Sequence, residues 1–337
     1  MKLQLIIVSI FVFPTIVSAQ WIKQKVESKA SLRGLSVVSE KIIWAGGTGG
    51  TVLKTGNGGK TWQVIIVPGA EKLDFRDIEA FDANTAYILS IGNGDASRIY
   101  KTTDGGKNWK LQFINRDEKA FYDAIACLDR NNCLAMSDPV DGRFPMIRTT
   151  NGMTWRPIAE NKLPAAIEGE AAFAASGTCL FINHQNRNVY LVTGGAVSRV
   201  LFSSIRGSKW TAVETPVTQG SSSSGIFSIA FYDGLKGAVV GGDYQKPDAA
   251  DNNIALTKNG GKSWYSVKGL SGYRSGVTFI SESTIIAVGN NGSDLSFDGG
   301  QTWRKIGNEN LNAVAAKGRN AVWAVGQDGI VLKLHLQ

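Results

Sequence analysis

One motif recurs six times along the chain and constrains the fold more than any other feature of the sequence. Its full form is a Ser or Thr, any residue, an Asn or Asp, two glycines, two further residues and a Trp. Successive copies end 39 to 55 residues apart, a repeat length typical of propeller blades and of several solenoids. The motif tryptophans are Trp62, Trp109, Trp155, Trp210, Trp264 and Trp303.

The residue types of the motif predict a tight turn between two strands. Each copy stands between apolar runs, which is typical of a β-hairpin with a glycine-rich turn. An Asn or Asp side chain accepts backbone N–H bonds two residues on, and glycine adopts a positive φ at no steric cost. The Trp closes the turn, and we expect its ring to be buried. The Asn and Asp positions are Asn57, Asp104, Asn151, Asn259 and Asp298, and the copy that ends at Trp210 lacks one.

Two more strand-like runs precede most copies, so each repeat predicts a four-stranded propeller blade. After the last copy a further set of runs covers residues 311–315, 321–325 and 330–334, and no outer strand follows it. Residues 21–26 offer that strand, with Trp21 in the place of a motif Trp. Pairing the two ends would remove exposed edges and lock the ring. We therefore predict an all-β, seven-bladed β-propeller of four-stranded blades, formed by residues 20–337 as one domain, with the last blade closed by the N-terminal strand.

The first nineteen residues differ from the rest and predict a secretory signal peptide. Lys2 is followed by an apolar run over residues 5–13 and by a small-residue ending at Ala19, as in signal peptides that are cleaved on export. The alternative is an N-terminal membrane anchor, which needs about 20 apolar residues, more than this run offers. We expect cleavage of residues 1–19 before Gln20 and a mature chain, without a membrane span, in the periplasm or outside the cell.

The composition argues against several common classes of protein. The 36 Lys and Arg exceed the 28 Asp and Glu, for a net charge of +8, but they form no basic stripe, so we expect no nucleic-acid partner. The two His and three Cys are too few for a zinc cluster, and no nucleotide-binding or metalloprotease motif is present. We expect no cofactor, no metal and a monomeric protein.

The motif resembles the Asp-box, or BNR, repeat of sialidases and other exported propellers. Residues 136–144, 169–180 and 241–248 are similar to segments of bacterial propellers grouped with the photosystem II stability/assembly factor family. The resemblance implies a seven-bladed propeller and, for the photosynthetic members, a non-catalytic assembly role. Bacterial members are often labelled oxidoreductases, and the resemblance supplies no chemistry for that label.

Candidate binding residues lie where the loops depart from the repeat. In a propeller, the loops between blades and those between the second and third strands meet at one mouth of the central channel, opposite the motif turns. We expect Glu168 and Glu170 at the entry to the innermost strand of the fourth blade. The polar side chains of these loops suit the binding of an anion or a peptide by arginine. Alternatively, they only stabilise the long loops by forming salt bridges with one another. The candidates are Asp138, Asp141, Arg143, Glu168, Glu170, Arg199, Asp243, Tyr244 and Lys246.

Three arginines near the starts of innermost strands, Arg33, Arg76 and Arg274, form a second candidate set. Sialidases hold a substrate carboxylate with three arginines, but the Tyr, Glu and Asp that such enzymes also need form no matching set here. A carboxyl pair such as Asp138 with Glu170 could serve another glycosidase as acid and base. The sequence gives no separation between the two groups.

Two functions of different classes therefore remain, both at the channel mouth. The first is an exported, non-catalytic binding or assembly scaffold that recognises a protein or an anionic ligand in the cell envelope. The second is a glycoside hydrolase with a carbohydrate ligand, and an oxidoreductase is third because no cofactor motif supports it. We favour the scaffold over an enzyme, because none of the residue sets that define a hydrolase of this fold is complete.

Two local features remain. Cys127 and Cys133 flank five residues that suit a tight turn between neighbouring strands, and in an oxidising compartment they either form a disulfide or stay as two small buried residues. Cys179 has no obvious mate. The serine-rich run over residues 220–225 predicts a flexible loop between the fourth and fifth blades.

Overall fold

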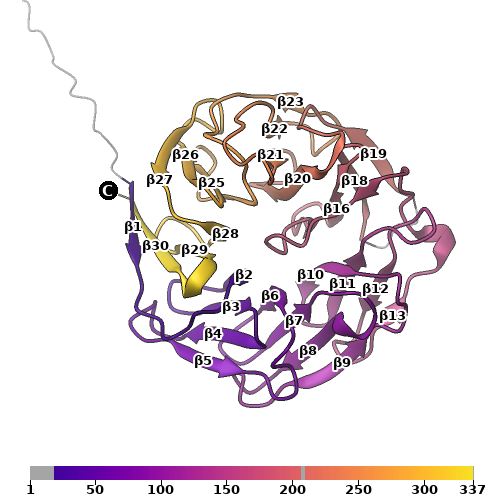
Figure 1. Ribbon diagram of the computed structural model, residues 1–337, viewed down its shortest axis with the longest axis vertical. Helices are drawn as coiled ribbons and strands as arrows, with labels where there is room; N and C mark the ends of the chain where they lie inside the picture. The colour runs from indigo at the N-terminus through magenta and orange to yellow at the C-terminus, as the bar shows by residue number, and fades with distance from the viewer. Residues whose placement is uncertain (1–18, 206–208, 337) are drawn as a thin grey trace, which may run out of the picture.

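The strands form seven antiparallel sheets arranged as a ring around a central channel, which confirms the predicted propeller (Figure 1). The computed structural model describes residues 19–205 and 209–336. The predicted signal peptide lies outside these residues except for Ala19, which begins the first strand. No helix in the described ranges is long and apolar enough to cross a bilayer.

The first three blades follow chain order from the channel outward. Blade 1 consists of β2 (Leu32–Val37), β3 (Ile43–Gly47), β4 (Thr51–Thr55) and β5 (Gln63–Ile66). Blade 2 consists of β6 (Phe75–Ala80), β7 (Ala86–Ser90), β8 (Arg98–Thr102) and β9 (Lys110–Ile114), with the 3-10 helix η1 (Gly94–Ala96) in one loop. Blade 3 consists of β10 (Tyr122–Asp129), β11 (Asn132–Ser137), β12 (Met146–Thr149) and β13 (Arg156–Pro157), and η2 (Glu160–Lys162) follows it.

The last four blades complete the ring. Blade 4 consists of β15 (Leu180–Ile182), β16 (Asn188–Val192), β18 (Arg199–Ser204) and β19 (Thr211–Glu214). Blade 5 consists of β20 (Ser221–Phe231), β21 (Gly237–Asp243), β22 (Ile254–Thr257) and β23 (Tyr265–Ser266). Blade 6 consists of β24 (Gly276–Phe279), β25 (Ile285–Gly289), β26 (Gly292–Ser296) and β27 (Arg304–Gly307). Blade 7 consists of β28 (Leu311–Ala316), β29 (Val322–Gly326), β30 (Val331–Leu336) and the N-terminal β1 (Ala19–Lys23), with η3 (Gln327–Gly329) between β29 and β30.

Blade 5 carries two additional short strands that the repeat does not predict. β14 (Glu170–Ala171) pairs with β17 (Gly194–Gly195), and β17 pairs with the start of β20, so this sheet has six strands. The prediction of a flexible serine-rich loop is therefore wrong, because residues 221–225 belong to β20 and pair with both β17 and β21. The prediction that Glu168 and Glu170 lie at the entry to the innermost strand of blade 4 is also wrong, since that strand is β15, which begins at Leu180.

The chain ends pair as predicted. β1 runs antiparallel to β30, with Trp21 opposite Leu334. The next residue, Ile22, lies opposite Lys333, and in blade 1 the residue after the motif Trp, Gln63, lies opposite Lys54 in the same way. Trp21 therefore has the register position of the motif Trp. Its ring is 9% exposed, and its indole N–H donates to Ser293 Oγ in blade 6 at 2.8 Å. The closing strand covers residues 19–23 rather than the predicted 21–26.

The motif turns hold each blade against the blade before it. In blade 1, Asn57 Oδ1 accepts the N–H of Thr61, four residues on rather than two, at 3.0 Å. Gly59 has a φ of 86°, and a Cβ there would lie 2.5 Å from the Trp323 ring of blade 7. The Trp62 ring meets the same Trp323 edge to face, with 5.7 Å between centroids. The six motif tryptophans are half-buried rather than fully buried.

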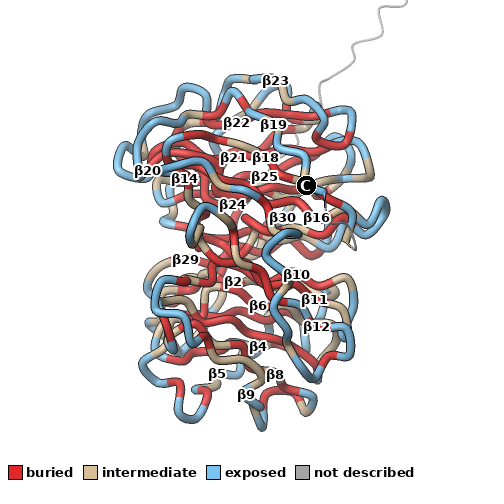
Figure 2. The backbone as a smooth tube through the Cα atoms, turned by 90° about the vertical axis from the view of Figure 1, so that its right-hand side faces the viewer, coloured by how far each residue is buried: buried red, intermediate tan, exposed pale blue. Residues whose placement is uncertain are grey.

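The core lies between the blades. The second strands are its centre: every residue of β3, β7, β25 and β29 is buried. Figure 2 shows these buried residues along the strands, with the exposed residues on the turns and loops. Cys127 and Cys133 face each other across β10 and β11 and form a disulfide, and Cys179 is buried and unpaired.

Ring closure predicts a large difference between two neighbouring residues of β1. Trp21→Ala should lower the free energy of unfolding by about 3–5 kcal/mol, because it removes a large side chain from the interface between blades 6 and 7. Ile22→Ala is the matched control: Ile22 is 47% exposed, and its loss should cost less than about 0.5 kcal/mol. Urea unfolding of both variants measures this, and equal costs would contradict the closure.

Candidate functional site

The innermost strands of five blades share an irregularity at one residue. In blades 1 and 2 the pairing register shifts by one residue at Arg33 and Arg76, and it does the same at Asp123, Phe227 and Asn312 in blades 3, 5 and 7. Such a β-bulge re-aims a side chain. In the sequence, each bulge corresponds to three consecutive residues: an apolar residue, the bulged residue, and a small residue or Asp. This pattern recurs at the same place in the innermost strand of these five blades.

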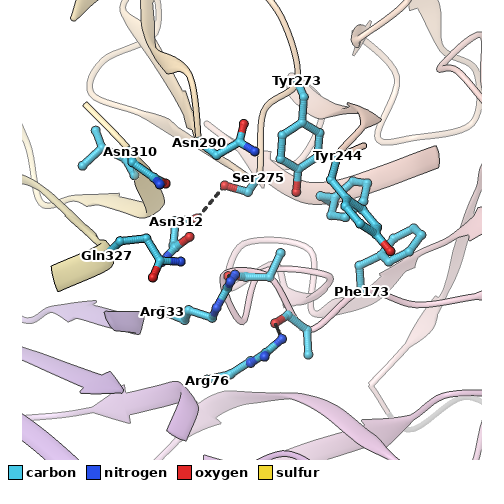
Figure 3. A pocket seen from close by; sticks show the side chains of 14 residues that line it. Arg33, Arg76, Phe173, Tyr244, Tyr273, Ser275, Asn290, Asn310, Asn312 and Gln327 are labelled. Carbon is cyan, nitrogen blue, oxygen red and sulfur yellow. Dashed lines mark hydrogen bonds between the residues drawn. The ribbon is translucent and has the colours of Figure 1, made fainter. Parts of the chain in front are cut away.

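A pocket of about 390 Å³ opens at the channel mouth, and two arginines form one side of it (Figure 3). Arg76 Nε donates to Asp74 Oδ2 at 2.8 Å, and its Nη1 donates to the Ala174 carbonyl at 3.2 Å. Arg33 Nη1 donates to the Ala175 carbonyl at 3.2 Å. Arg33 makes no ion pair with any described residue. Its pKa is lowered by burial and by the charge of Arg76, and the nearby Asp74 carboxylate, which is bound to Arg76, raises it in part. The pocket therefore holds a partly desolvated positive charge with no direct ion-pair partner among the described residues.

Aromatic rings form the opposite side of this channel pocket. Phe173 and Phe227 stack with centroids 4.0 Å apart, and Tyr273 meets Phe227 edge to face at 4.8 Å. Burial raises the pKa of Tyr273, so its phenol stays neutral. Tyr244 is 44% exposed and packs at 6.2 Å on Phe227, which places it at the rim.

Amide side chains complete the wall between the arginines and the tyrosines (Figure 3). They come from loops or strand starts of blades 6 and 7 and offer neutral donors and acceptors: Asn290, Asn310, Asn312 and Gln327. Asn312 Nδ2 is already used, because it donates to the Leu32 carbonyl of blade 1 at 2.8 Å. An anionic group attached to an apolar or aromatic body suits this combination of guanidinium, amide and ring.

Residues 172–179, which we call the strap, connect β14 to β15 and enter the channel beside blades 2 and 3. Asp138 Oδ1 accepts the N–H of Ala172 at 2.8 Å, and the two arginines hold the carbonyls of Ala174 and Ala175. Ser176 Oγ donates to the Ser275 carbonyl of blade 6 at 2.7 Å. The strap therefore joins opposite sides of the channel and forms the floor of the channel pocket.

Two buried carboxyl groups, Asp77 and Asp123, and the half-buried Asp138 lie close to the strap. Burial raises the pKa of Asp77, although the backbone N–H groups of Ile78 and Ile125 donate to it at 2.7 Å each. Burial and the neighbouring Asp138 raise the pKa of Asp123, whose Oδ2 has no hydrogen-bond partner among the described residues. Burial raises the pKa of Asp138 to about 6, against the Ala172 N–H.

Two other groups nearby can be assessed in the same terms. The pKa of the Cys179 thiol is raised by burial and by Asp123, so it is not an activated nucleophile. No group of three or more His, Cys, Asp or Glu within residues 19–205 and 209–336 could hold a metal ion.

The predicted loop residues fall in several places. Asp138, Glu168 and Glu170 line a second cavity, of about 650 Å³. Glu170 is buried and paired with Arg199, whose Nε donates to Oε1 at 2.9 Å. The others make local contacts. Asp141 forms an ion pair with Lys119 at 3.2 Å, and Arg143 Nη1 donates to the Leu163 carbonyl at 3.2 Å. Asp243 is buried and accepts the N–H of Gln245 at 3.0 Å, and Lys246 Nζ lies 3.9 Å from its carboxylate.

Arg274 does not reach the channel pocket. In blade 6 Gly276 pairs with Val288, as Gly34 pairs with Gly46 in blade 1. Counting back from these glycines, Ser275 has the register position of Arg33. Arg274 has the position of Leu32, which is buried. The Arg274 side chain is fully buried, and its Nε donates to Asp294 Oδ2 at 2.8 Å. The sequence did not single out Phe173, Phe227, Tyr273 or the amides, although the bulge pattern marks Phe227 and Asn312.

Comparison with solved structures supports the seven-bladed propeller fold. Two solved structures of YCF48 share the fold. One, described as YCF48 bound to D1 peptide, has a TM-score of 0.66 and 16% identity over 93% of this chain and 94% of that one. The other, from Cyanidioschyzon merolae, has a TM-score of 0.67 and 20% identity over 94% and 99%.

A glycoside hydrolase also shares the fold. The GH74 enzyme of Niastella koreensis has a TM-score of 0.60 and 14% identity over 92% of this chain but only 53% of its own. No family model matches the chain, and no curated protein matches it. At these identities the likeness establishes the propeller fold, and the expected resemblance to photosystem II assembly factors is confirmed at the level of fold.

The buried carboxyls predict a pH-dependent stability. The folded protein keeps their protons above the ordinary Asp value of 3.8, and Asp138 keeps its proton to about 6. The unfolded chain loses these protons first, so the free energy of unfolding should fall as the pH rises from about 4 through 6. Asp123→Asn fixes one group in a neutral form and should reduce this fall. Chemical unfolding at several pH values measures it.

The control for this experiment is Asp251→Asn, which changes an exposed carboxylate and should leave the pH dependence as in the wild type. A wild-type protein whose stability rises steadily from pH 4 to 7 would contradict the assignment of protonated carboxyls under the strap.

Proposed function

We propose that the protein is a non-catalytic binding scaffold that recognises an acidic segment of a partner protein at the channel mouth, in the cell envelope after export. The observation that carries this proposal is Arg33, a desolvated guanidinium with no ion-pair partner among the described residues, at the wall of an open pocket. A carboxylate would supply the missing countercharge, and charge-assisted hydrogen bonds of this kind are among the strongest in proteins.

The aromatic side of the pocket supports a peptide ligand over a small inorganic anion. Phe173, Phe227 and Tyr244 offer a large apolar surface next to the guanidinium groups, and such surfaces contribute much of the binding energy at protein interfaces. A propeller of the same fold has been solved as YCF48 bound to D1 peptide. That structure supports peptide recognition by this fold and does not identify the partner of this chain.

A glycoside hydrolase is supported less well by the same geometry. The pair Asp138 and Glu170 would have to act as acid and base. Glu170 accepts hydrogen bonds from Arg199 and from the Thr193 hydroxyl, so its carboxylate oxygens are occupied. Asp138 accepts a hydrogen bond from the N–H of Ala172 in the strap, so its role there is to position the strap.

Selection from a random peptide library on the immobilised wild-type protein tests the proposal. We expect enrichment of sequences with Asp or Glu beside an aromatic or large apolar residue. Arg33→Gln should lose most of this enrichment and weaken the selected peptides by at least about tenfold, the usual effect of removing a charge-assisted contact of roughly 1.5 kcal/mol. Thermal unfolding should show a folded variant.

The matched control is Arg116→Gln, which removes the same charge from an exposed loop residue of blade 2. It should retain the wild-type enrichment, because Arg116 does not line the channel pocket. Enrichment without any acidic preference, or equal losses in both variants, would show that the ligand is not bound by the charge of Arg33.

A further inference from the structure

A second cavity shares the channel mouth and has the opposite charge. It is lined by Asp138, Glu168 and Glu170, together with Phe121 and Ile167, and its volume is about 650 Å³. We call it the acidic pocket. The strand β14 and the start of the strap lie between it and the channel pocket. Glu170 and Ala171 line the acidic pocket, whereas residues 173–175 line the channel pocket.

Pairing the charges leaves a net negative charge in the acidic pocket. Glu170 is neutralised by Arg199, whose side chain is 11% exposed. Lys119, the cation that lines the cavity, is paired at 3.2 Å with Asp141, and both side chains are exposed. Asp138 and Glu168 make no ion pair within the described residues.

Asp123 is a buried neighbour of Asp138. It is 1% exposed, it lies close enough to Asp138 for the charge of one to raise the pKa of the other, and its Oδ2 accepts no hydrogen bond in the described structure. A cation in the acidic pocket would stabilise the ionised form of Asp138, which burial disfavours. Phe121 and Ile167 offer apolar surface to the methylene stem of a basic side chain.

The strap fixes the distance between the two charges. Asp138 binds the strap at Ala172, Arg76 binds it at Ala174, and Arg33 binds it at Ala175. Two to three residues of chain span at most about 10 Å, and the strap turns here, because the N–H of Ala175 donates to the Phe173 carbonyl at 2.8 Å, so its contact points lie closer together than that. A peptide that runs along the strap therefore meets the carboxylate and the guanidinium groups two to four of its own positions apart.

We infer that the acidic pocket is a second subsite, which takes a lysine or arginine side chain of the same segment whose acidic side chain enters the channel pocket. The ligand class is thus an extended peptide with an acidic and a basic residue two to four positions apart. This inference rests on the proposed function, because it needs the acidic residue to occupy the channel pocket.

Defined peptides test the inference by fluorescence anisotropy. The reference is a labelled, amidated ten-residue peptide of glycine and alanine with one glutamate beside one phenylalanine. A series adds one lysine one, two, three, four or six positions from the glutamate. We expect lysine at two to four positions to tighten binding to wild type by about fivefold, which corresponds to roughly 1 kcal/mol for a partly exposed ion pair, and lysine at one or six positions to have little effect.

The double variant Asp138→Asn and Glu168→Gln should lose the lysine effect. Glu168→Gln alone leaves the contact of Asp138 with the strap intact, so it should reduce the lysine effect and keep the affinity for the reference peptide. Glu27→Gln, which alters a carboxylate that is 82% exposed near the same mouth, should keep the full lysine effect.

The outcomes separate this inference from the proposed function. Binding of the reference peptide without any gain from lysine overturns the second subsite and leaves the channel pocket standing. A gain that does not depend on spacing, or that persists in the double variant, also overturns it. Failure of the reference peptide to bind wild type, or equal binding to Arg33→Gln, overturns the proposed function and the inference that rests on it.

Discussion

The pairing of β1 with β30 is the constraint on which the rest of the structure depends. It supplies the outer strand of blade 7 and places that blade beside blade 1, where Gly59 and Trp62 pack on Trp323. It also brings Asn312 next to Leu32, across 280 residues of chain. Without this contact the channel would open between blades 7 and 1, and the amides of blade 7 would separate from the arginines of blades 1 and 2.

The closed ring turns a local irregularity into a site. A β-bulge at one place in five blades directs Arg33, Arg76, Asp123, Phe227 and Asn312 toward the axis. The residue at each bulge is free to vary because the sheet behind it needs only an apolar residue before it and a compact one after it. Binding chemistry can therefore change at these positions without changing the fold.

The strap divides the channel mouth into two chemically different halves. The Asp138 carboxyl of blade 3 binds it at Ala172, and the guanidinium groups of blades 2 and 1 bind it two and three residues further on. The positive half combines an arginine that has no direct ion-pair partner in the described structure with rings and amides, whereas the negative half surrounds Asp138 and Glu168. Both halves face one opening, so a single extended partner can contact both.

The repeat predicted the blades, their number and the closure by Trp21, because each depends on local turn chemistry that recurs in the sequence. The predicted arginine set had a mixed outcome for a geometric reason. Arg33 and Arg76 are bulged residues, whereas Arg274 lies one position earlier and is buried, and a shift of one residue moves a side chain to the other face of a strand. The sequence alone does not show where a bulge begins.

The strap was not predictable in the same way. The sequence placed the innermost strand of blade 4 directly after Glu170, whereas the tertiary contacts of Ala172, Ala174, Ala175 and Ser176 keep the strap in the channel. The aromatic side was missed for a related reason. Phe173 and Phe227 resemble core residues in the sequence, and their position at an open pocket follows from the strap and a bulge.

The central claim is that ligands bind at the strap and the bulged residues, opposite the motif turns. Hydrogen–deuterium exchange, measured by mass spectrometry with and without a selected acidic peptide, tests it most directly. The account predicts slower exchange at residues 172–179, 273–275 and 310–312 when the peptide is bound. Protection confined to the motif turns, such as residues 57–62 and 298–303, with an unchanged strap, would contradict it.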